Sequence, residues 1–453
     1  MSRLTIPLQP IQREIVPAPS TGKRFHMWTI GCQMNEADSA KVAAMLQEVG
    51  YEPTTTEQDA DVIVLNSCVV RQAAEDKVAG KLGSLARVKR ERPDVQIVLT
   101  GCMVTKQQES LKARFPHVDL FFDPSDFDKL QTIIPELSSL DDDLGQIPHY
   151  YLPESSESAV TAYIPIIYGC NFLCSYCIVP YRRGKETSRP MADIVREVEG
   201  LVARGVRDIT LLGQTVNAWG HDIDGGANDL ADLLTAVDAV PGMERLRFLT
   251  SHPKYMTERL LDRMAALPSV CEHLNLPVQA GDDDVLRRMR RTYSSDLWRE
   301  RIAYARSVMP GLTVATDIIV GFPGETAEQF DNTLALLEEV ACDKVHVAMY
   351  SPRPGTLSAR WEDDVPHDEK HRRHQEVEKL QERLLTARNA DRVGARYDVL
   401  VDTKQKGRWT GRTRGNLLVH IESDDDLLGQ LVPVRITQSS PWFLLGQPDN
   451  SAA

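Results

Sequence analysis

The chain has 453 residues, of which 42% are apolar and 26% charged, which is an ordinary globular composition with enough length for about three domains. No apolar run approaches the ~18 residues of a membrane span, and no signal-peptide pattern is present, so we expect a cytoplasmic protein whose thiols stay reduced. The net charge of −13 argues against broad, non-specific affinity for nucleic acid but allows a local basic patch.

The first segments are a leader and an α/β domain. Residues 1–23 are rich in proline and lack a hydrophobic period, which indicates a mobile leader without a chemical role. From residue 24 to 138, apolar strands alternate with helices, a pattern typical of a parallel sheet with right-handed crossovers. We therefore expect a parallel α/β domain of Rossmann or flavodoxin-like type, with strands at Phe25–Ile30, Asp61–Asn66 and Val95–Thr100.

A cysteine follows each of these strands within two residues, namely Cys32, Cys68 and Cys102. The carboxyl ends of parallel strands share one edge of the sheet, where ligands bind at a switch point of the strand order. The three thiols should therefore meet at one place. They could be three buried small residues, but their regular placement favours a metal centre.

A polar, acidic stretch over residues 139–159 indicates a linker. Between residues 160 and 390, six apolar strands alternate with helices, which predicts a partial (β/α)6 barrel whose active edge is formed by the carboxyl ends of the strands. We expect the strands at Tyr163–Ile167, Asp208–Leu212, Leu246–Thr250, His273–Val278, Thr313–Val320 and Lys344–Tyr350.

A second cysteine set, Cys170, Cys174 and Cys177, lies directly after the first barrel strand with the spacing C-x3-C-x2-C. Thiolates this close converge on one centre, and sulfur ligands select zinc or iron–sulfur clusters. A structural zinc site usually has a fourth Cys or His nearby, but the next histidine is His221. Three ligands on a four-iron cluster leave one iron open for a small chelating molecule.

The other barrel strands end in glycines and uncharged polar residues, which favours a ligand pocket, although ordinary turns would account for each loop alone. These loops contain Gln214, Asn217, Gln279 and Glu325, and also His252, which is expected to be structural. The basic segment 181–190 follows the cysteine loop and would suit a carboxylate or a phosphate, unless it is a solvated loop.

The last segment, residues 391–450, consists of short alternating strands separated by Gly, Asn and Asp turns, which predicts a small antiparallel β-barrel. One hairpin carries cations around a tryptophan and no acid, a combination that suits phosphate contacts and base stacking. A plain solvated hairpin is the alternative. The residues predicted to bind RNA are Lys404, Lys406, Arg408, Trp409, Arg412 and Arg414.

These motifs resemble a known family. The stretch from Tyr168 to Pro190 is similar to the cysteine loop of the radical S-adenosylmethionine (SAM) superfamily. With Asn66–Arg71 and Gly213–Asn217, the chain resembles the radical-SAM methylthiotransferases, and among them most closely the tRNA-2-methylthio-N(6)-dimethylallyladenosine synthases. The terminal barrel resembles a TRAM domain, and the resemblance covers residues 24–447.

The resemblance implies two 4Fe-4S clusters. The loop cysteines would hold the cluster that cleaves SAM to a 5′-deoxyadenosyl radical, and the three strand-end cysteines would hold an auxiliary cluster that carries the sulfur to be inserted. Gln214, Asn217, Gln279 and Glu325 would line the SAM pocket, and no catalytic residue is assigned beyond the cluster ligands. The implied reaction inserts a methylthio group at carbon 2 of N(6)-dimethylallyladenosine at position 37, next to the tRNA anticodon, with a second SAM as methyl donor.

The implied partners are a tRNA carrying the isopentenylated adenosine, an external flavodoxin-like reductant and a sulfur donor, and the protein is expected to be a monomer. Two alternatives stay open. One is a methylthiotransferase for a ribosomal-protein aspartate or for threonylcarbamoyl-adenosine, against which the Val-Val-Arg after Cys68 and the basic patch count. The other is an RNA-binding protein with structural zinc at both cysteine sets, against which the polar strand-end loops count.

Overall fold

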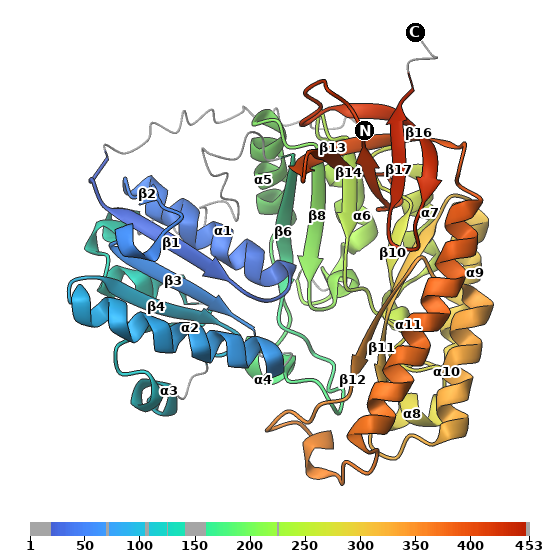
Figure 1. Ribbon diagram of the computed structural model, residues 1–453, viewed down its shortest axis with the longest axis horizontal. Helices are drawn as coiled ribbons and strands as arrows, with labels where there is room; N and C mark the ends of the chain where they lie inside the picture. Colours follow the sequence, from blue (N-terminus) through green and yellow to red (C-terminus); the bar gives the residue numbers. More distant parts are fainter. Residues whose placement is uncertain are drawn as a thin grey trace, which may run out of the picture.

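The computed structural model describes residues 20–68, 72–104, 108–124, 126–140, 160–223 and 226–449. An N-terminal α/β unit and a small C-terminal barrel flank a central parallel β/α unit (Figure 1). The expected fold class is confirmed. The expected leader and linker lie almost wholly outside the described residues. Within the described ranges, no helix is long and apolar enough to cross a membrane.

The N-terminal unit is a five-stranded parallel sheet in the order β2-β1-β3-β4-β5. This is the flavodoxin-like strand order, which places the switch point between β1 and β3. The strands are β1 Arg24–Thr29, β2 Glu52–Pro53, β3 Val62–Ser67, β4 Gln96–Gly101 and β5 Leu120–Phe121, and the helices are α1 Gln33–Glu48, α2 Gln72–Glu91 and α3 Glu109–Arg114.

Helices α1 and α2 cover opposite faces of this sheet (Figure 1). Successive side chains of a strand point to opposite faces, so Val62 and Val64 pack towards α1 while Ile63 and Leu65 pack towards α2. A strand buried on both faces reads as a continuous apolar run, which is why β3 was predictable.

The central unit has six parallel barrel strands in two sheets. Between β9 and the residues just before β10 the ladder is reduced to an isolated bridge from Leu246 to Val270, which divides the barrel strands into the two sheets. The strands are β6 Thr161–Tyr168, β8 Asp208–Gly213, β9 Arg245–Phe248, β10 His273–Asn275, β11 Thr313–Val320 and β12 Lys344–Met349, with β7 Thr187–Ser188 antiparallel at the edge. The helices are α4 Val179–Arg183, α5 Met191–Ala203, α6 Leu230–Asp238, α7 Glu258–Ala266, α8 Asp283–Arg288, α9 Ser295–Val308, α10 Ala327–Val340 and α11 His367–Ala390.

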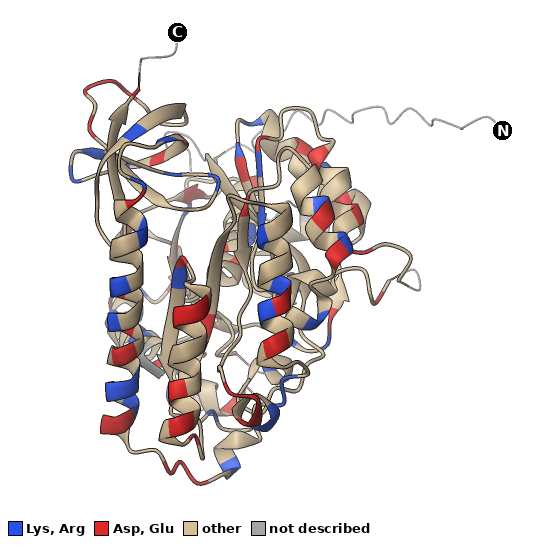
Figure 2. Ribbon diagram, turned by 90° about the vertical axis from the view of Figure 1, so that its right-hand side faces the viewer, with Lys and Arg blue, Asp and Glu red and all other residues tan. Residues whose placement is uncertain are grey.

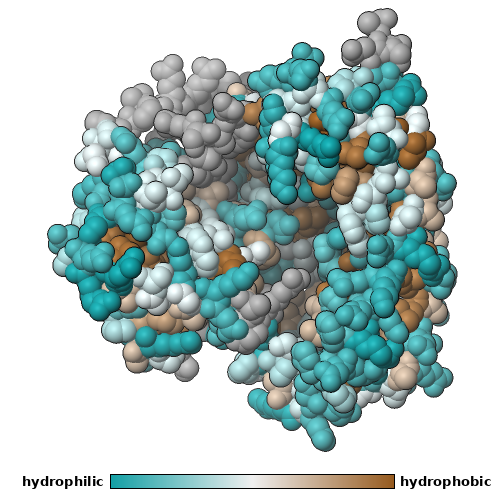
Figure 3. Space-filling model, viewed as in Figure 1, coloured by the Kyte–Doolittle hydropathy of each residue, from teal (hydrophilic) through white to brown (hydrophobic). Residues whose placement is uncertain are grey.

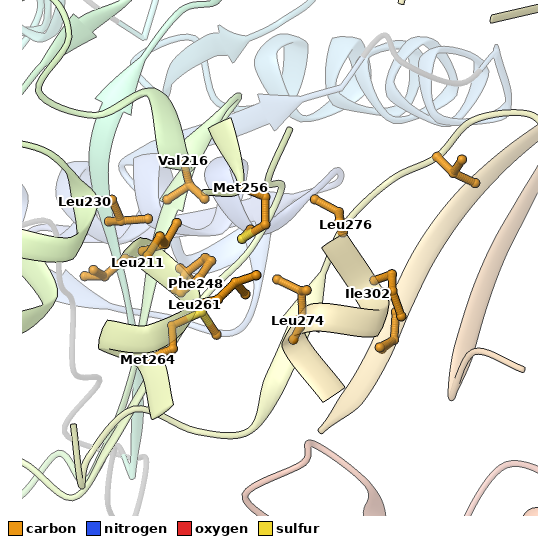
Figure 4. Packing of buried hydrophobic residues seen from close by; sticks show 14 of the residues in the cluster. Leu211, Val216, Leu230, Phe248, Met256, Leu261, Met264, Leu274, Leu276 and Ile302 are labelled. Carbon is orange, nitrogen blue, oxygen red and sulfur yellow. The ribbon is translucent and has the colours of Figure 1, made fainter. Parts of the chain in front are cut away.

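The outer faces of these strands form the main hydrophobic core. Figure 4 shows Phe248 and Leu274 packed with Leu261 and Met264 of α7 and Ile302 of α9. Each such fully buried side chain stabilises the fold by roughly 1.5–3 kcal/mol. The inner faces instead carry polar side chains that line a cavity, including Thr210, Arg247, His273, Asn275 and Thr313. The core therefore holds the strands from outside and leaves the interior for a ligand.

The C-terminal unit is a closed barrel in the order β13-β14-β15-β17-β16. Its strand pairs are antiparallel, as expected, except that β15 and β17 run parallel where the barrel closes. The strands are β13 Arg396–Gln405, β14 Arg408–Arg412, β15 Leu418–Ile421, β16 Leu431–Ser439 and β17 Leu444–Pro448. Helix α11, along which cations and acids are interspersed, leads into this barrel (Figure 2).

Two buried arginines of β9 anchor the C-terminal barrel to the central unit. Arg245 donates to the carbonyl oxygens of Asp398 (2.9 Å) and Arg412 (2.6 Å). Arg247 donates to the carbonyl of Thr413 (2.9 Å) and forms a buried ion pair with Asp208 (3.0 Å). The small barrel is thus docked at the amino ends of the central strands, opposite to the cysteine loop.

We predict that Arg247→Ala lowers the free energy of unfolding by about 3–5 kcal/mol, because it leaves the buried Asp208 carboxylate unpaired. Thermal unfolding and limited proteolysis near residues 391–396 would measure the effect. The matched control is Arg287→Ala, whose ion pair with Asp284 is exposed (75% and 63%) and should contribute about 0.5 kcal/mol. Equal losses for the two variants would contradict the anchoring role.

Candidate active site

A cavity of about 1270 Å³ extends along the inner faces of the central strands. It opens in the hollow between the N-terminal and central units (Figure 3). Members of both cysteine sets line it, namely Cys32, Cys68, Cys170, Cys174 and Cys177. Two groups of thiols that are far apart in the chain therefore face the same space.

The N-terminal cysteines stand at one edge of their sheet, as expected. Cys32 follows β1 and Cys68 follows β3, on either side of the switch point, and Cys102 follows β4. Gly31 (φ +153°) makes the close approach possible, because a Cβ at this position would lie 3.0 Å from the Cβ of Cys68 and 2.5 Å from Asn35 Oδ1.

Buried amide and hydroxyl groups support these loops. Asn35 Nδ2 donates to Asn66 Oδ1 (2.8 Å), and Asn66 Nδ2 donates to Ser39 Oγ (3.0 Å). Ser67 Oγ donates to the carbonyl of Thr100 (2.6 Å), which connects the ends of β3 and β4. A satisfied buried network of this kind gives the cysteine-bearing turns one defined arrangement.

The second cysteine set occupies the loop after β6, as expected. Cys170 Sγ lies 3.4 Å from Thr215 Oγ1, and the amide of Cys177 donates to the carbonyl of Cys174 (3.1 Å). Burial, reinforced by Cys174, raises the pKa of Cys177 to about 12. At neutral pH this sulfur ionises only when a positive charge such as a metal compensates the burial.

Two arginines that the sequence did not single out as sulfur partners contact the cysteine sets. Arg183 Nε lies 3.3 Å from Cys102 Sγ, and Arg291 Nη1 lies 3.3 Å from Cys174 Sγ. Arg183 belongs to the basic segment 181–190, expected to meet a carboxylate or phosphate ligand, but it is buried against protein groups, and Arg189 pairs with Glu197 (2.7 Å).

The donor set fits iron–sulfur clusters better than zinc. Among the described residues, no three His, Cys, Asp or Glu side chains are arranged to hold a metal ion. Zinc ligands must all approach one point to ~2.0–2.3 Å. A four-iron cluster takes its thiolates on different irons, so its ligands stand farther apart. Thiols at strand ends beside a cavity with room for a cluster suit the second arrangement.

Two of the four residues predicted for the SAM pocket line the cavity. Gln214 follows β8, and Gln279 follows β10 in a left-handed conformation (φ 75°). Asn217 and Glu325 do not line it.

Asn217 connects two loops instead. Its amide donates to the carbonyl of His252 (3.0 Å) and accepts from the amide of His252 (2.8 Å). His252 stacks on Phe172 of the cysteine loop at 3.9 Å, and burial lowers its pKa to about 2, so it is uncharged at neutral pH. Both hydrogen-bonding groups of Asn217 are thereby used within the protein, and the residue positions the loops around the cavity.

Glu325 stabilises the fold instead. Its carboxylate accepts from the amide of Gly321 (2.6 Å) and pairs with Arg373 of α11 (2.8 Å), with side chains 1% and 5% exposed. The expectation that Glu325 contacts a cofactor is wrong, because its carboxylate is enclosed between the loop after β11 and α11.

Of the predicted RNA-binding residues, two are used within the protein and four are exposed. Trp409 is 6% exposed and packs in the core of the small barrel, so it does not offer a face to a base. Arg414 pairs with Glu272 of the central unit (2.9 Å). These two expectations are corrected, since both side chains are used in packing and docking. Lys404, Lys406, Arg408 and Arg412 are exposed on the small barrel.

A cysteine loop after the first strand of a partial β/α barrel, facing a cavity of ligand size, defines a radical SAM enzyme. Family models agree: residues 164–337 match the radical SAM superfamily, residues 24–123 match Uncharacterized protein family UPF0004, and residues 391–448 match the TRAM domain. The fold is also similar to that of the radical SAM methyltransferase TsrM from Kitasatospora setae with cobalamin and a [4Fe-4S] cluster bound (TM-score 0.53, 14% identity, 74% of each chain).

Relatives identify the family more closely. The tRNA-2-methylthio-N(6)-dimethylallyladenosine synthase of Chloroflexus aurantiacus is 50% identical over 94% of this chain and 91% of its own. The enzyme of that name from Herpetosiphon aurantiacus is 47% identical over 93% and 97%. The chain belongs to the tRNA-2-methylthio-N(6)-dimethylallyladenosine synthase family.

We predict that Glu325→Ala lowers the free energy of unfolding by roughly 2–4 kcal/mol, because Arg373 loses its most buried partner. The SAM affinity of the folded variant should be unchanged. Gln214→Ala should weaken SAM binding roughly tenfold without a comparable loss of stability. Calorimetry and thermal unfolding would separate the two effects, and the exposed Glu328→Ala is the control for Glu325.

Proposed function

We propose that the chain inserts a methylthio group at carbon 2 of N(6)-dimethylallyladenosine next to the anticodon of tRNA. The observation that carries this proposal is that members of both cysteine sets line one cavity: Cys32 and Cys68 of the first set and all three of the second, with the buried Cys102 behind its wall. The reaction needs a group that activates an unreactive aromatic C–H bond and a group that delivers sulfur to the same carbon. Membership of the synthase family supports the same reaction.

The cavity suits two 4Fe-4S clusters. Cys170, Cys174 and Cys177 would hold one of them, and the set at the N-terminal sheet edge would hold the auxiliary cluster through Cys32, Cys68 and Cys102. When bound, the clusters and SAM supply the radical, sulfur and methyl chemistry, which protein side chains cannot perform. The protein positions these groups and keeps competing reactants out.

The chain's own residues shape the space between the two cysteine sets. Gln214 and Gln279 offer uncharged amide groups at strand ends on the cavity wall, where they would bind SAM. Phe172, stacked on His252, forms an apolar wall next to Cys170. Such a wall excludes water from the reacting atoms, which protects a radical from side reactions.

The tRNA would be held by the C-terminal barrel. The exposed cations there, Lys404, Lys406, Arg408 and Arg412, suit phosphate contacts on a protein of net charge −13. We assign residues 24–138 to the auxiliary-cluster domain, 160–390 to the radical SAM core and 391–450 to the TRAM domain, and the matched ranges support this division.

Further partners follow from the chemistry. An external reductant of the flavodoxin type would supply the electron for SAM cleavage, and a separate sulfur donor would replace the sulfur consumed in each turnover. We further propose that the protein acts as a monomer in the cytoplasm, where tRNA and low-potential reductants are present. Methylthiolation of a ribosomal-protein aspartate or of threonylcarbamoyl-adenosine is disfavoured by the identity to the dimethylallyladenosine synthases.

We predict that anaerobically reconstituted protein contains about eight irons with matching acid-labile sulfide, and that a Cys170/Cys174/Cys177 triple alanine variant retains about four. With SAM, dithionite and tRNA carrying the isopentenylated adenosine, the wild type should form 5′-deoxyadenosine and the methylthiolated nucleoside, detected by mass spectrometry. The triple variant should form neither.

The same tRNA lacking the isopentenyl group is the substrate control. Zinc without sulfide in both proteins would overturn the radical mechanism. If the clusters are intact but no methylthiolated nucleoside forms on the isopentenylated tRNA, the fold assignment stands and the proposed reaction is refuted.

We predict that alanine at Lys404, Lys406, Arg408 and Arg412 together weakens tRNA binding. The slope of log affinity against log salt is negative, and its magnitude should decrease by about 1 for each phosphate that these side chains neutralise in the wild type. Filter binding at several salt concentrations would measure this. Trp409→Phe is the matched control: because the ring is buried, tRNA affinity should not change. A large decrease in affinity with Trp409→Phe would instead indicate base stacking.

A further inference from the structure

Arg183 joins the two cysteine sites. It ends α4, the short helix that follows the second cysteine set, where the central unit meets the N-terminal unit (Figure 1). Its Nη2 donates to Asp38 Oδ2 of α1 at 3.0 Å, and its Nε donates to Cys102 Sγ at 3.3 Å. The Arg183 and Asp38 side chains are only 6% and 1% exposed.

An ion pair that served only to dock the two units would direct more of the guanidinium at the carboxylate. Among the described residues, Asp38 Oδ1 is buried without a hydrogen-bond partner, while the Nε–H group of Arg183 is aimed at sulfur. A neutral thiol is a weak acceptor, whereas a thiolate that ligates a metal carries negative charge and accepts well. The geometry therefore matches a charged sulfur at Cys102.

The second cysteine set has a comparable contact. Arg291 Nη1 donates to Cys174 Sγ at 3.3 Å, and Arg291 Nε donates to the hydroxyl of Tyr293 at 2.7 Å. Each set thus has one arginine donor directed at one sulfur. Arg291 lies wholly within the central unit, so it provides a matched comparison for Arg183, which crosses between the units.

We propose that Arg183 is a positioning residue that holds Cys102 as a thiolate ligand of the auxiliary centre and fixes that centre relative to the one held by the Cys170–Cys177 loop. The inference rests on the proposed function, because it requires a centre at Cys32, Cys68 and Cys102. Arg183 follows Cys177 closely in the chain, so the segment that carries one ligand set also contacts the other.

Two consequences follow from the charge and the hydrogen bond. Reduction adds an electron to the centre, and a cation donating to a ligand sulfur stabilises the more negative state, so Arg183 raises the midpoint potential of the auxiliary centre. Arg291 does the same for the other centre. Removing either arginine should therefore lower the potential of one centre only.

The test is an EPR-monitored redox titration of full-length, anaerobically reconstituted protein. The Cys170/Cys174/Cys177 triple alanine background isolates the auxiliary centre. In it, Arg183→Gln should keep about four irons, shift the midpoint potential to more negative values and change the EPR line shape. Arg183→Lys keeps the charge beside Asp38, and hence the fold, but lacks the Nε–H donor, and should give a smaller shift in the same direction.

Asp38→Asn and Arg291→Gln complete the set. In the triple background Arg291→Gln should leave the auxiliary potential nearly unchanged. Asp38→Asn removes a buried negative charge beside the Arg183–Cys102 contact and should therefore shift that potential to more positive values, opposite to Arg183→Gln. In the otherwise wild-type chain Arg291→Gln should lower the potential of the other centre. If Arg183→Gln and Asp38→Asn both lower the melting temperature and neither moves the auxiliary potential, Arg183 only docks the units and the inference is wrong. If the triple variant holds no iron, the two-centre assignment fails, and the inference falls with it.

Discussion

The active site depends on the direction of the β-strands. Parallel strands present all their carboxyl ends at one edge, and in this protein the N-terminal sheet and the central partial barrel are joined so that the edges of both face one cavity. One contact between them is apolar: Met34 and Ala37 of α1 pack with Leu212 of β8, next to Tyr163 and Leu249. Because Cys32 caps the amino end of α1, the packing that joins these parts also fixes the position of this cysteine.

Buried charges hold the units in a defined relative position. Arg183 with Asp38 connects the N-terminal and central units, and Arg247 with Asp208 lies under the C-terminal barrel. A buried ion pair adds little net stability over an apolar contact, but removing one partner is costly, so such pairs favour one arrangement over its alternatives. This requirement suits an enzyme in which the cysteines around one cavity come from two separate sheets.

The sequence was informative wherever a local pattern carried the signal. The apolar runs predicted β3, β6 and β11, and the cysteines just after β1, β3 and β6 predicted loops that line the cavity, whereas Cys102 after β4 does not line it. For the small barrel, the sequence pattern consisted of short strands with alternating apolar and polar residues. The cations on both sides of Trp409 in the sequence suggested an exposed binding surface, whereas the ring of Trp409 packs in the barrel core.

What the sequence determined by itself is the chemistry: thiols at spacings that suit iron–sulfur clusters, on loops at the carboxyl ends of parallel strands. Only the tertiary structure decided which polar side chains remain available to a ligand. Asn217 and Glu325 stand at strand ends like Gln214, yet their partners, His252 and Arg373, come from distant segments. A strand-end position says where a side chain starts, but what it contacts depends on long-range packing, which no local pattern encodes.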